Sequence, residues 1–318
     1  MILVTGGTGF IGNVLIRHLS NLGHPVKLLL QPSKDNPNLP KGVPSEVAVT
    51  SLNDVKGLRA ALKDVDIVYH LASAESYGRE AQLTDVDIQG TARLLAAASQ
   101  STINRFYYLS HLGADRASAY PLLKAKAIAE QQIKSSGIPY TIFRSAVAFG
   151  EHDHFSNNLA FLLKISPYLV MLPDNGSSLL QPIWVEDLAR VLTWSLEMPI
   201  TKNQTIPLGG AEYLSFRDIC VMIMEKLKIK RHFVNANPSL LHLLTELLEI
   251  VVPKFPTTVF WLDYLATNRT TNLDVLLRMF DLIPARMSHQ IDYLSERKFR
   301  KTFWQLLSKG KRTTIQWD

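Results

Sequence analysis

Short apolar runs alternate with amphipathic segments along the first 150 residues. Near-continuous apolar runs predict strands over residues 1–5, 26–30, 46–49, 66–70, 105–109 and 140–143. Apolar residues at helical spacing predict helices over residues 10–22, 52–62, 90–99 and 124–134. Strands that are apolar throughout are typical of a parallel sheet with helices on both faces. We therefore predict an α/β fold with a doubly wound parallel sheet.

The pattern changes after Gly150. Prolines at positions 167, 173, 182, 199 and 207 separate short elements, and the segment from Pro238 onward has helical periodicity. We predict a sheet domain over residues 1–150, a smaller substrate-side lobe over residues 151–294 that is interleaved with the last sheet strands, and a tail over residues 295–318.

Residues 240–252 form the most apolar run of the chain. Four polar residues interrupt it and fall on one helical face: His242, Thr245, Glu246 and Glu249. The run is too short to span a bilayer. We expect an amphipathic helix packed on the body of the protein.

A glycine-rich loop joins the first predicted strand to the first helix and reads Thr5-Gly6-Gly7-Thr8-Gly9-Phe10-Ile11-Gly12. In dinucleotide-binding loops the glycines permit a tight turn, a close approach of backbone N–H groups to the pyrophosphate, and close packing of helix and strand. The positive helix end stabilises the phosphates. The alternative is a structural glycine turn. We predict that the loop binds NAD(H) or NADP(H) through Gly6, Thr8, Gly9, Phe10, Ile11 and Gly12.

The end of the second strand carries no acidic residue. An Asp or Glu there would bond the ribose 2′-hydroxyl of NAD. The chain has Gln31 instead, and Lys34 follows closely. We expect both to lie near the ribose and slightly favour NADP over NAD, with the alternative that Lys34 is only a solvated loop residue.

These residues resemble the extended short-chain dehydrogenase/reductases, as an atypical member. The likeness covers roughly residues 1–235 and includes the segments 69–73, 86–91, 107–111, 126–130, 138–144 and 181–189. The subgroup it is most similar to is that of the Rossmann-type accessory subunit of respiratory complex I and its bacterial relatives, which are related to NAD-dependent epimerase/dehydratase and NmrA-like proteins. The resemblance implies a Rossmann domain over residues 1–150, with Leu71, Ala72 and Ser73 beside the cofactor.

The resemblance also implies a Ser, Tyr and Lys set in active members, with the lysine four residues after the tyrosine. Ser110 matches the serine. Tyr120 and Lys124 satisfy the spacing literally, but Glu130 and the twelve-residue step from Ser110 favour a second register. In that register the lysine is Lys126, which would still bind the cofactor, and the tyrosine position holds Leu122. Leucine cannot transfer a proton.

Other candidate features give weaker indications. His152 and His154 flank Asp153, but no third ligand at suitable spacing is evident, so we predict a loop near the substrate mouth and no metal. The single Cys220 excludes an intrachain disulfide. The chain starts without the features of a signal peptide, and we expect a cytoplasmic location.

The net charge of +6 comes from the C-terminal tail, since residues 297–312 contain seven Lys and Arg and no acid. Phe299, Phe303, Leu306 and Leu307 lie at helical spacing there. A basic amphipathic helix suits an anionic membrane surface or an acidic protein partner, which would make the protein peripheral to the membrane. The alternative is a helix packed on the body. We expect no nucleic acid partner, because no recognised motif accompanies the charges.

Two hypotheses of function follow. One is an NAD(P)-binding protein with little or no turnover that senses cofactor or supports assembly, as the complex I resemblance implies. The other is an active NAD(P)-dependent oxidoreductase or sugar-nucleotide-type epimerase that uses Tyr120 and Lys124. The sequence identifies no small-molecule substrate.

Overall fold

The computed structural model describes residues 1–33, 39, 42–252, 256–297 and 299. Lys34 and nearly all of the predicted tail, including Phe303, Leu306 and Leu307, lie outside these residues. The chain divides into two compact units, each built from segments that are not consecutive in the sequence. Unit 1 comprises Met1–Ala74, Gln82–Ser145 and Val185–Leu208, and unit 2 comprises Glu75–Ala81, Ala146–Trp184 and Gly209–Asp318. The partition at residues 150 and 294 stays a prediction.

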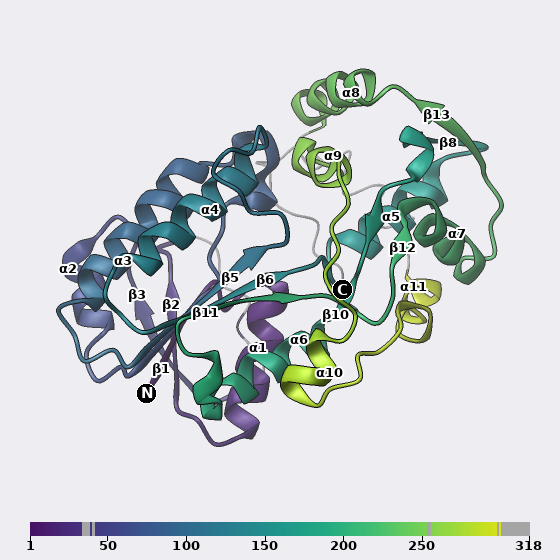
Figure 1. The fold of residues 1–318 in the computed structure, drawn as a ribbon. Coiled ribbons are helices and arrows are strands. Elements are labelled where there is room, and N and C mark those ends of the chain that lie inside the picture. Colours follow the sequence, from purple (N-terminus) through teal and green to yellow (C-terminus); the bar gives the residue numbers. More distant parts are fainter. Residues whose placement is uncertain (34–38, 40–41, 253–255, 298, 300–318) are drawn as a thin grey trace. The chain divides into compact units, whose positions relative to one another are not determined.

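Unit 1 is built on a seven-stranded sheet in the order β11-β6-β5-β4-β1-β2-β3 (Figure 1). All neighbouring strands run parallel. The predicted doubly wound α/β sheet is therefore confirmed. The strands are β1 (Ile2–Thr5), β2 (Val26–Leu30), β3 (Ser45–Val49), β4 (Ile67–His70), β5 (Arg105–His111), β6 (Tyr140–Ser145) and β11 (Gln204–Leu208).

Helices cover both faces of this sheet. On one face α1 and α6 pack side by side, and on the other α2, α3 and α4 follow one another (Figure 1). A π-helical stretch, η2, runs directly into α3. The elements are α1 (Phe10–Asn21), α2 (Val55–Ala61), η2 (Thr84–Gly90), α3 (Thr91–Ala98), α4 (Pro121–Lys134), α6 (Val185–Trp194), η4 (Ser195–Glu197) and η5 (Pro199–Thr201).

An aromatic row crosses the middle of the sheet. The rings of Tyr69 and Tyr107 stack with centroids 4.4 Å apart, and Phe143 on β6 continues the row. Tyr69 Oη donates to the backbone oxygen of Leu192, 2.7 Å away. The row therefore fills the space between the sheet and α6 with apolar rings whose buried hydroxyl groups are satisfied.

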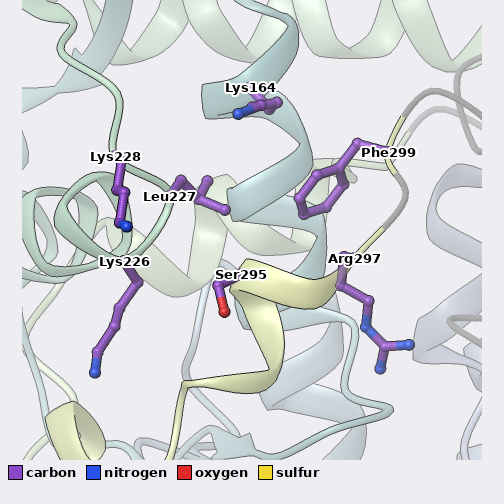
Figure 2. A pocket seen from close by; sticks show the side chains of 7 residues that line it. All are labelled: Lys164, Lys226, Leu227, Lys228, Ser295, Arg297 and Phe299. Carbon is purple, nitrogen blue, oxygen red and sulfur yellow. The ribbon is translucent and has the colours of Figure 1, made fainter.

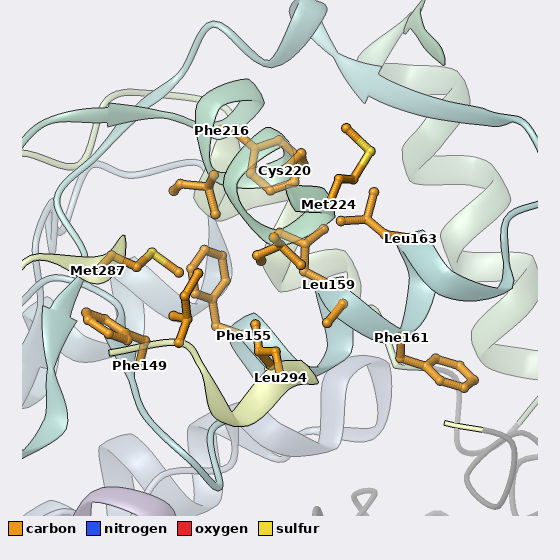
Figure 3. Packing of buried hydrophobic residues seen from close by; sticks show 14 of the residues in the cluster. Phe149, Phe155, Leu159, Phe161, Leu163, Phe216, Cys220, Met224, Met287 and Leu294 are labelled. Carbon is orange, nitrogen blue, oxygen red and sulfur yellow. The ribbon is translucent and has the colours of Figure 1, made fainter. Parts of the chain in front are cut away.

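Unit 2 has a core between α5 and α7. Phe155, Leu159 and Leu163 on α5 face Cys220 and Met224 on α7 (Figure 3). Its strands are β7 (Ala148–Phe149), β8 (Leu169–Pro173), β9 (Leu179–Leu180), β10 (Ile183–Trp184), β12 (Leu214–Ser215) and β13 (His232–Ala236). Its helices are η1 (Glu75–Glu80), α5 (Phe155–Ile165), η3 (Asp174–Gly176), α7 (Phe216–Lys226), α8 (Pro238–Val251), α9 (Val259–Leu265), α10 (Val275–Phe280), η6 (Met287–His289) and α11 (Tyr293–Glu296).

The helix predicted over residues 240–252 is present as α8, and the face that it buries holds Leu241 together with two polar residues. Thr245 and Glu249 are buried, whereas the leucines on the opposite side are exposed. Glu249 is accommodated because its carboxylate accepts the backbone N–H of Val259 at 3.1 Å. Among the described residues, no helix combines the length and the apolar character needed to cross a bilayer.

Candidate dinucleotide site

The strand order of unit 1 reverses between β1 and β4. From β1 the chain proceeds to β2 and β3 on one side, and from β4 to β5 and β6 on the other. Thr5 and His70 lie opposite each other at the carboxyl ends of these two strands. In doubly wound sheets this reversal opens a crevice, which is where ligands bind.

The glycine loop leaves β1 at this crevice. Gly6 has a φ of +71°, and a Cβ atom there would lie 2.7 Å from the backbone of Leu71 and Ala72. A Cβ atom on Gly12 would lie 2.3 Å from the carbonyl oxygen of Gly6. Any side chain at either position would separate β1, α1 and the loop that follows β4. These glycines are therefore required by the close packing of three backbone segments.

The N-terminus of α1 is open to a ligand. Gly9 is its N-cap, and it is exposed and offers no side-chain oxygen to the first-turn N–H groups. No acidic side chain lies in the first turn, which begins with Phe10 and Ile11. Free N–H groups and the positive end of the helix dipole favour a phosphate at this position. Thr8 is half-buried beside them. The loop thus fits the pyrophosphate of a dinucleotide.

The residues that follow β2 lack a carboxylate as far as they are described. Gln31, Pro32 and Ser33 are all exposed. Gln31 can donate and accept hydrogen bonds but carries no charge that would repel a 2′-phosphate. The position of Lys34 lies outside the described residues.

A buried histidine connects the two central strands. Thr91 Oγ1 donates to the backbone oxygen of Asp87 at 2.6 Å, so it accepts the Nε2 proton of His70, 2.9 Å away. The Nδ1 atom then accepts the hydroxyl proton of Thr5 at 2.6 Å, and Thr5 Oγ1 accepts from Ala72 N at 3.3 Å. Burial, and then the charge of Lys126, lower the pKa of His70 to about 3. This neutral histidine holds the 71–73 loop against β1.

Lys126 forms the second buried connection. It lies on α4, is 2% exposed, and its Nζ is 3.1 Å from Asp87 Oδ1 on η2. The other oxygen of Asp87 accepts Ala74 N at 3.0 Å, and the ammonium lies 5.5 Å from the centroid of the Tyr108 ring. The pair thus joins α4, η2 and the end of the 71–73 loop, and both of its charges are buried.

The other catalytic candidates are placed differently. Tyr120 is the half-buried N-cap of α4, and Lys124 is exposed on that helix. Leu122 is buried in the first turn. Ser110 is buried on β5, and its hydroxyl donates to Glu130 at 2.6 Å. The structure therefore brings Lys126, and not Lys124, to Asp87.

Asp87, His70 and Glu130 were predicted only as parts of sequence motifs, without a role. The Glu130 carboxylate accepts a hydrogen bond from the Ser110 hydroxyl. It also accepts two hydrogen bonds from the Arg144 guanidinium, at 2.9 and 2.7 Å. The signal available in the sequence was a polar or charged residue within each of these segments. The hydrogen-bond partner of Glu130 could not be predicted, because Glu130 and Ser110 lie 20 residues apart and meet only when α4 packs on β5.

The loop at residues 152–154 has a structural role. Asp153 is buried and its carboxylate accepts Gly150 N at 2.8 Å and Ser156 N at 2.5 Å, so it caps α5. Tyr293 also donates to it, at 3.1 Å. His152 is exposed and His154 half-buried. Across the described ranges, His, Cys, Asp and Glu form no group of three that could hold a metal ion.

Comparisons with known proteins agree with this site. Residues 6–153 match a family model described as NAD(P)H-binding. The chain is 24% identical over 307 residues to NADH dehydrogenase (ubiquinone) 1 alpha subcomplex subunit 9, mitochondrial, of Arabidopsis thaliana, covering 92% of this chain and 76% of that protein. It is 25% identical over 209 residues to the photosystem II assembly factor Ycf39 of Trieres chinensis. That match covers 66% of this chain and 63% of Ycf39, so the chain spans less than two thirds of this relative.

A solved structure shows the same fold. The UDP-glucose 4-epimerase of Thermus thermophilus, in complex with NAD, superposes with a TM-score of 0.70 at 19% identity. The match covers 94% of this chain and 98% of the epimerase. The expected resemblance to the complex I subunit is confirmed, and residues 6–153 are similar to NAD(P)H-binding domains.

The buried pair yields the first prediction. Removing one member leaves the other charge buried and unpaired, so Asp87→Asn and Lys126→Gln should each lower the free energy of unfolding by about 3–5 kcal/mol. The double variant pairs two neutral amides and should lose less than the sum of the single losses by about 1 kcal/mol or more. Urea unfolding of the four proteins at neutral pH measures this.

Lys124→Gln is the matched control, because Lys124 is exposed on the same helix. It should change the free energy of unfolding by less than about 0.5 kcal/mol. Strictly additive losses in the double variant would contradict a pairwise interaction between Asp87 and Lys126.

Proposed function

We propose that this chain, an NAD(P)-binding Rossmann-like protein homologous to subunits of mitochondrial NADH dehydrogenase and to Ycf39, holds a nicotinamide dinucleotide and does not reduce ordinary carbonyl substrates. The observation that carries the proposal is the environment of α4. Lys126 is buried against Asp87, and the position four residues before it is Leu122. A lysine is thus retained beside the dinucleotide site, without a tyrosine on the same face.

Bound NAD(P)H would supply a hydride, and reduction of a carbonyl also needs a proton donor. In the register that we propose, this donor would stand at Leu122, whose side chain has no ionisable group. The Ser110 hydroxyl donates to Glu130 instead of facing an open site. His70 is fully buried and neutral, with both ring nitrogens engaged. The residues nearest to the crevice therefore support binding better than proton transfer.

The cofactor that we favour is NADP. Gln31 presents no charge to a 2′-phosphate, in contrast to the carboxylate that selects NAD. The remaining cofactor contacts that we propose come from the loop of residues 6–12, from Leu71, Ala72 and Ser73, and from Lys126. Lys34 stays a predicted contact.

The role that we propose is support of assembly or sensing of the dinucleotide. One relative, Ycf39, is named as an assembly factor. The other is named as a subunit of NADH dehydrogenase. A protein that binds a dinucleotide without consuming it is stabilised in proportion to the logarithm of the ligand concentration. Such a protein therefore reports cofactor supply through its own stability.

A second candidate function is an active oxidoreductase or epimerase. It is favoured by the fold that the chain shares with an epimerase over 94% of its length. In this case Tyr120 and Lys124 would act, although Tyr120 is the N-cap of α4 and Lys124 is exposed.

Nucleotide binding tests the main proposal. Titration of the protein with NADPH and NADH, followed by fluorescence, should show saturable binding of both. Gly9→Val should abolish it, since the valine side chain would occupy the space of the pyrophosphate. The Gly9 backbone, with φ of −76° and ψ of 171°, is open to any residue, but a Cβ atom there would lie 3.3 Å from the carbonyl oxygen of Gly6. A near-native thermal midpoint without nucleotide is therefore the control. Binding that survives Gly9→Val would contradict the placement of the pyrophosphate.

Cofactor preference is tested at Gln31. Gln31→Asp should raise the ratio of the NADPH dissociation constant to the NADH constant by about tenfold or more, because the carboxylate repels the 2′-phosphate and bonds the 2′-hydroxyl. Gln31→Asn keeps the position neutral and should leave the ratio nearly unchanged. If Gln31→Asp leaves the ratio of the two dissociation constants at its wild-type value, the ribose lies away from the end of β2.

Turnover separates the two candidate functions. With NADPH and a panel of carbonyl compounds and nucleotide sugars, the protein should show no oxidation of NADPH and no epimerisation above the rate without protein. Tyr120→Phe should change nothing, neither the background rate nor the affinity for NADPH. A wild-type rate that Tyr120→Phe removes would overturn the main proposal and establish the second candidate.

A further inference from the structure

Exposed apolar side chains are concentrated on two segments of unit 2. Residues 164–173 and 226–251 hold 11 of the 24 large apolar side chains that are exposed in the described part of the chain. A single exposed leucine needs no explanation, but a concentration of them on consecutive elements indicates a surface that binds something. We name as the apolar rim the outward residues of β8, β13 and α8 in these segments: Tyr168, Leu169, Met171, Val234, Leu240, Leu243, Leu247, Ile250 and Val251.

The first part of the rim is a two-stranded ribbon. β8 and β13 run parallel, with Leu169 opposite His232 and Met171 opposite Val234. Alternate residues of the same strands, such as Leu172, point into the core of unit 2. Strand periodicity therefore places Leu169, Met171 and Val234 together on the outer face. Tyr168, 75% exposed, precedes this face.

The second part is α8, which follows β13 directly, with Asn237 as its N-cap (Figure 1). Two of its polar residues, Thr245 and Glu249, are buried within unit 2. His242 lies between Glu246 on the same helix and Asp263 on α9, with N···O distances of 3.3 and 3.4 Å. The outward stripe is left to leucine, isoleucine and valine, up to Val251 at 75% exposure. A water-soluble helix ordinarily has the reverse arrangement.

The charges beside the rim are positive. The two segments contain five Lys and Arg, of which Lys226 pairs with Asp292, and two acids, of which Glu249 is buried. Lys164 and Lys228 are exposed and line a pocket of about 220 Å³ at the ends of α5 and α7 (Figure 2). Leu227 and Phe299 point into this pocket and supply apolar walls (Figure 2). Cations around an apolar floor match the headgroup region of an anionic lipid.

We propose that the apolar rim docks on the surface of a bilayer that contains anionic phospholipids. Its aliphatic side chains enter the boundary between headgroups and acyl chains, Tyr168 lies at the headgroup level, and the lysines of the pocket donate hydrogen bonds to lipid phosphates. A neutral apolar protein partner would need no cations at the edge. The apolar rim belongs to unit 2 and the dinucleotide site to unit 1, and the proposal does not depend on the proposed function.

Flotation of the full-length protein with vesicles tests the proposal. Vesicles of phosphatidylcholine with phosphatidylglycerol should bind it, and vesicles of phosphatidylcholine alone should bind it less. Leu243→Glu with Leu247→Glu should weaken binding about 100-fold or more, since each buried leucine contributes about tenfold or more. Lys164→Gln with Lys228→Asn should weaken binding to the anionic vesicles roughly 25-fold, at about fivefold for each lysine.

Ile200→Glu with Val49→Glu is the matched control. It also replaces two exposed apolar residues by carboxylates, but in unit 1. It should bind vesicles within about twofold of the wild type, and near-native circular dichroism in all variants excludes unfolding. The basic residues beyond position 299 are present in every protein, so their contribution cancels.

Two results would overturn the proposal. One is equal binding of the Leu243→Glu, Leu247→Glu variant and its control. The other is a wild type that ignores both vesicle types but sediments as a dimer that this variant dissociates, which would assign the rim to a second copy of the chain.

Discussion

The buried ion pair between Lys126 and Asp87 is the constraint on which the crevice of unit 1 depends. The two charges lie in a region where burial makes any unpaired charge expensive, so α4 and η2 are held in one relative position. Asp87 also accepts the N–H of Ala74, and His70 holds the start of the same loop against β1. The glycine loop packs on this loop at Gly6. The shape of the dinucleotide crevice thus follows from a few buried polar contacts.

The same constraint limits the chemistry. Lys126 is 2% exposed, and its ammonium group is paired with Asp87. Ser110 is committed in a similar way, since Glu130 accepts its proton and is itself held by Arg144. These polar groups thus form internal connections. In the function that we propose, they rigidify the binding site and so favour affinity for a ligand over its conversion.

The strands and the glycine loop could be predicted because they depend on local patterns. An apolar run such as residues 26–30 is buried on both faces, so its limits agree with those of β2. The contacts of His70 could not be predicted, since Thr5 lies 65 residues away in the sequence and meets it only through the strand order. β11 joins the sheet beside β6 after a long excursion through unit 2, which no periodicity records. Local order was readable, and long-range pairing was not.

The orientation of α8 shows a further limit of periodicity. The spacing of His242, Thr245, Glu246 and Glu249 establishes two different faces, but not which one is buried. The outcome depends on the partners that α9 offers: the N–H of Val259 for Glu249 and the carboxylate of Asp263 for His242. Buried polar groups with partners cost little, and the apolar face is then left outward at a cost in hydration free energy. Contact of this face with another apolar phase would remove that cost, which is the energetic basis of the docking that we propose.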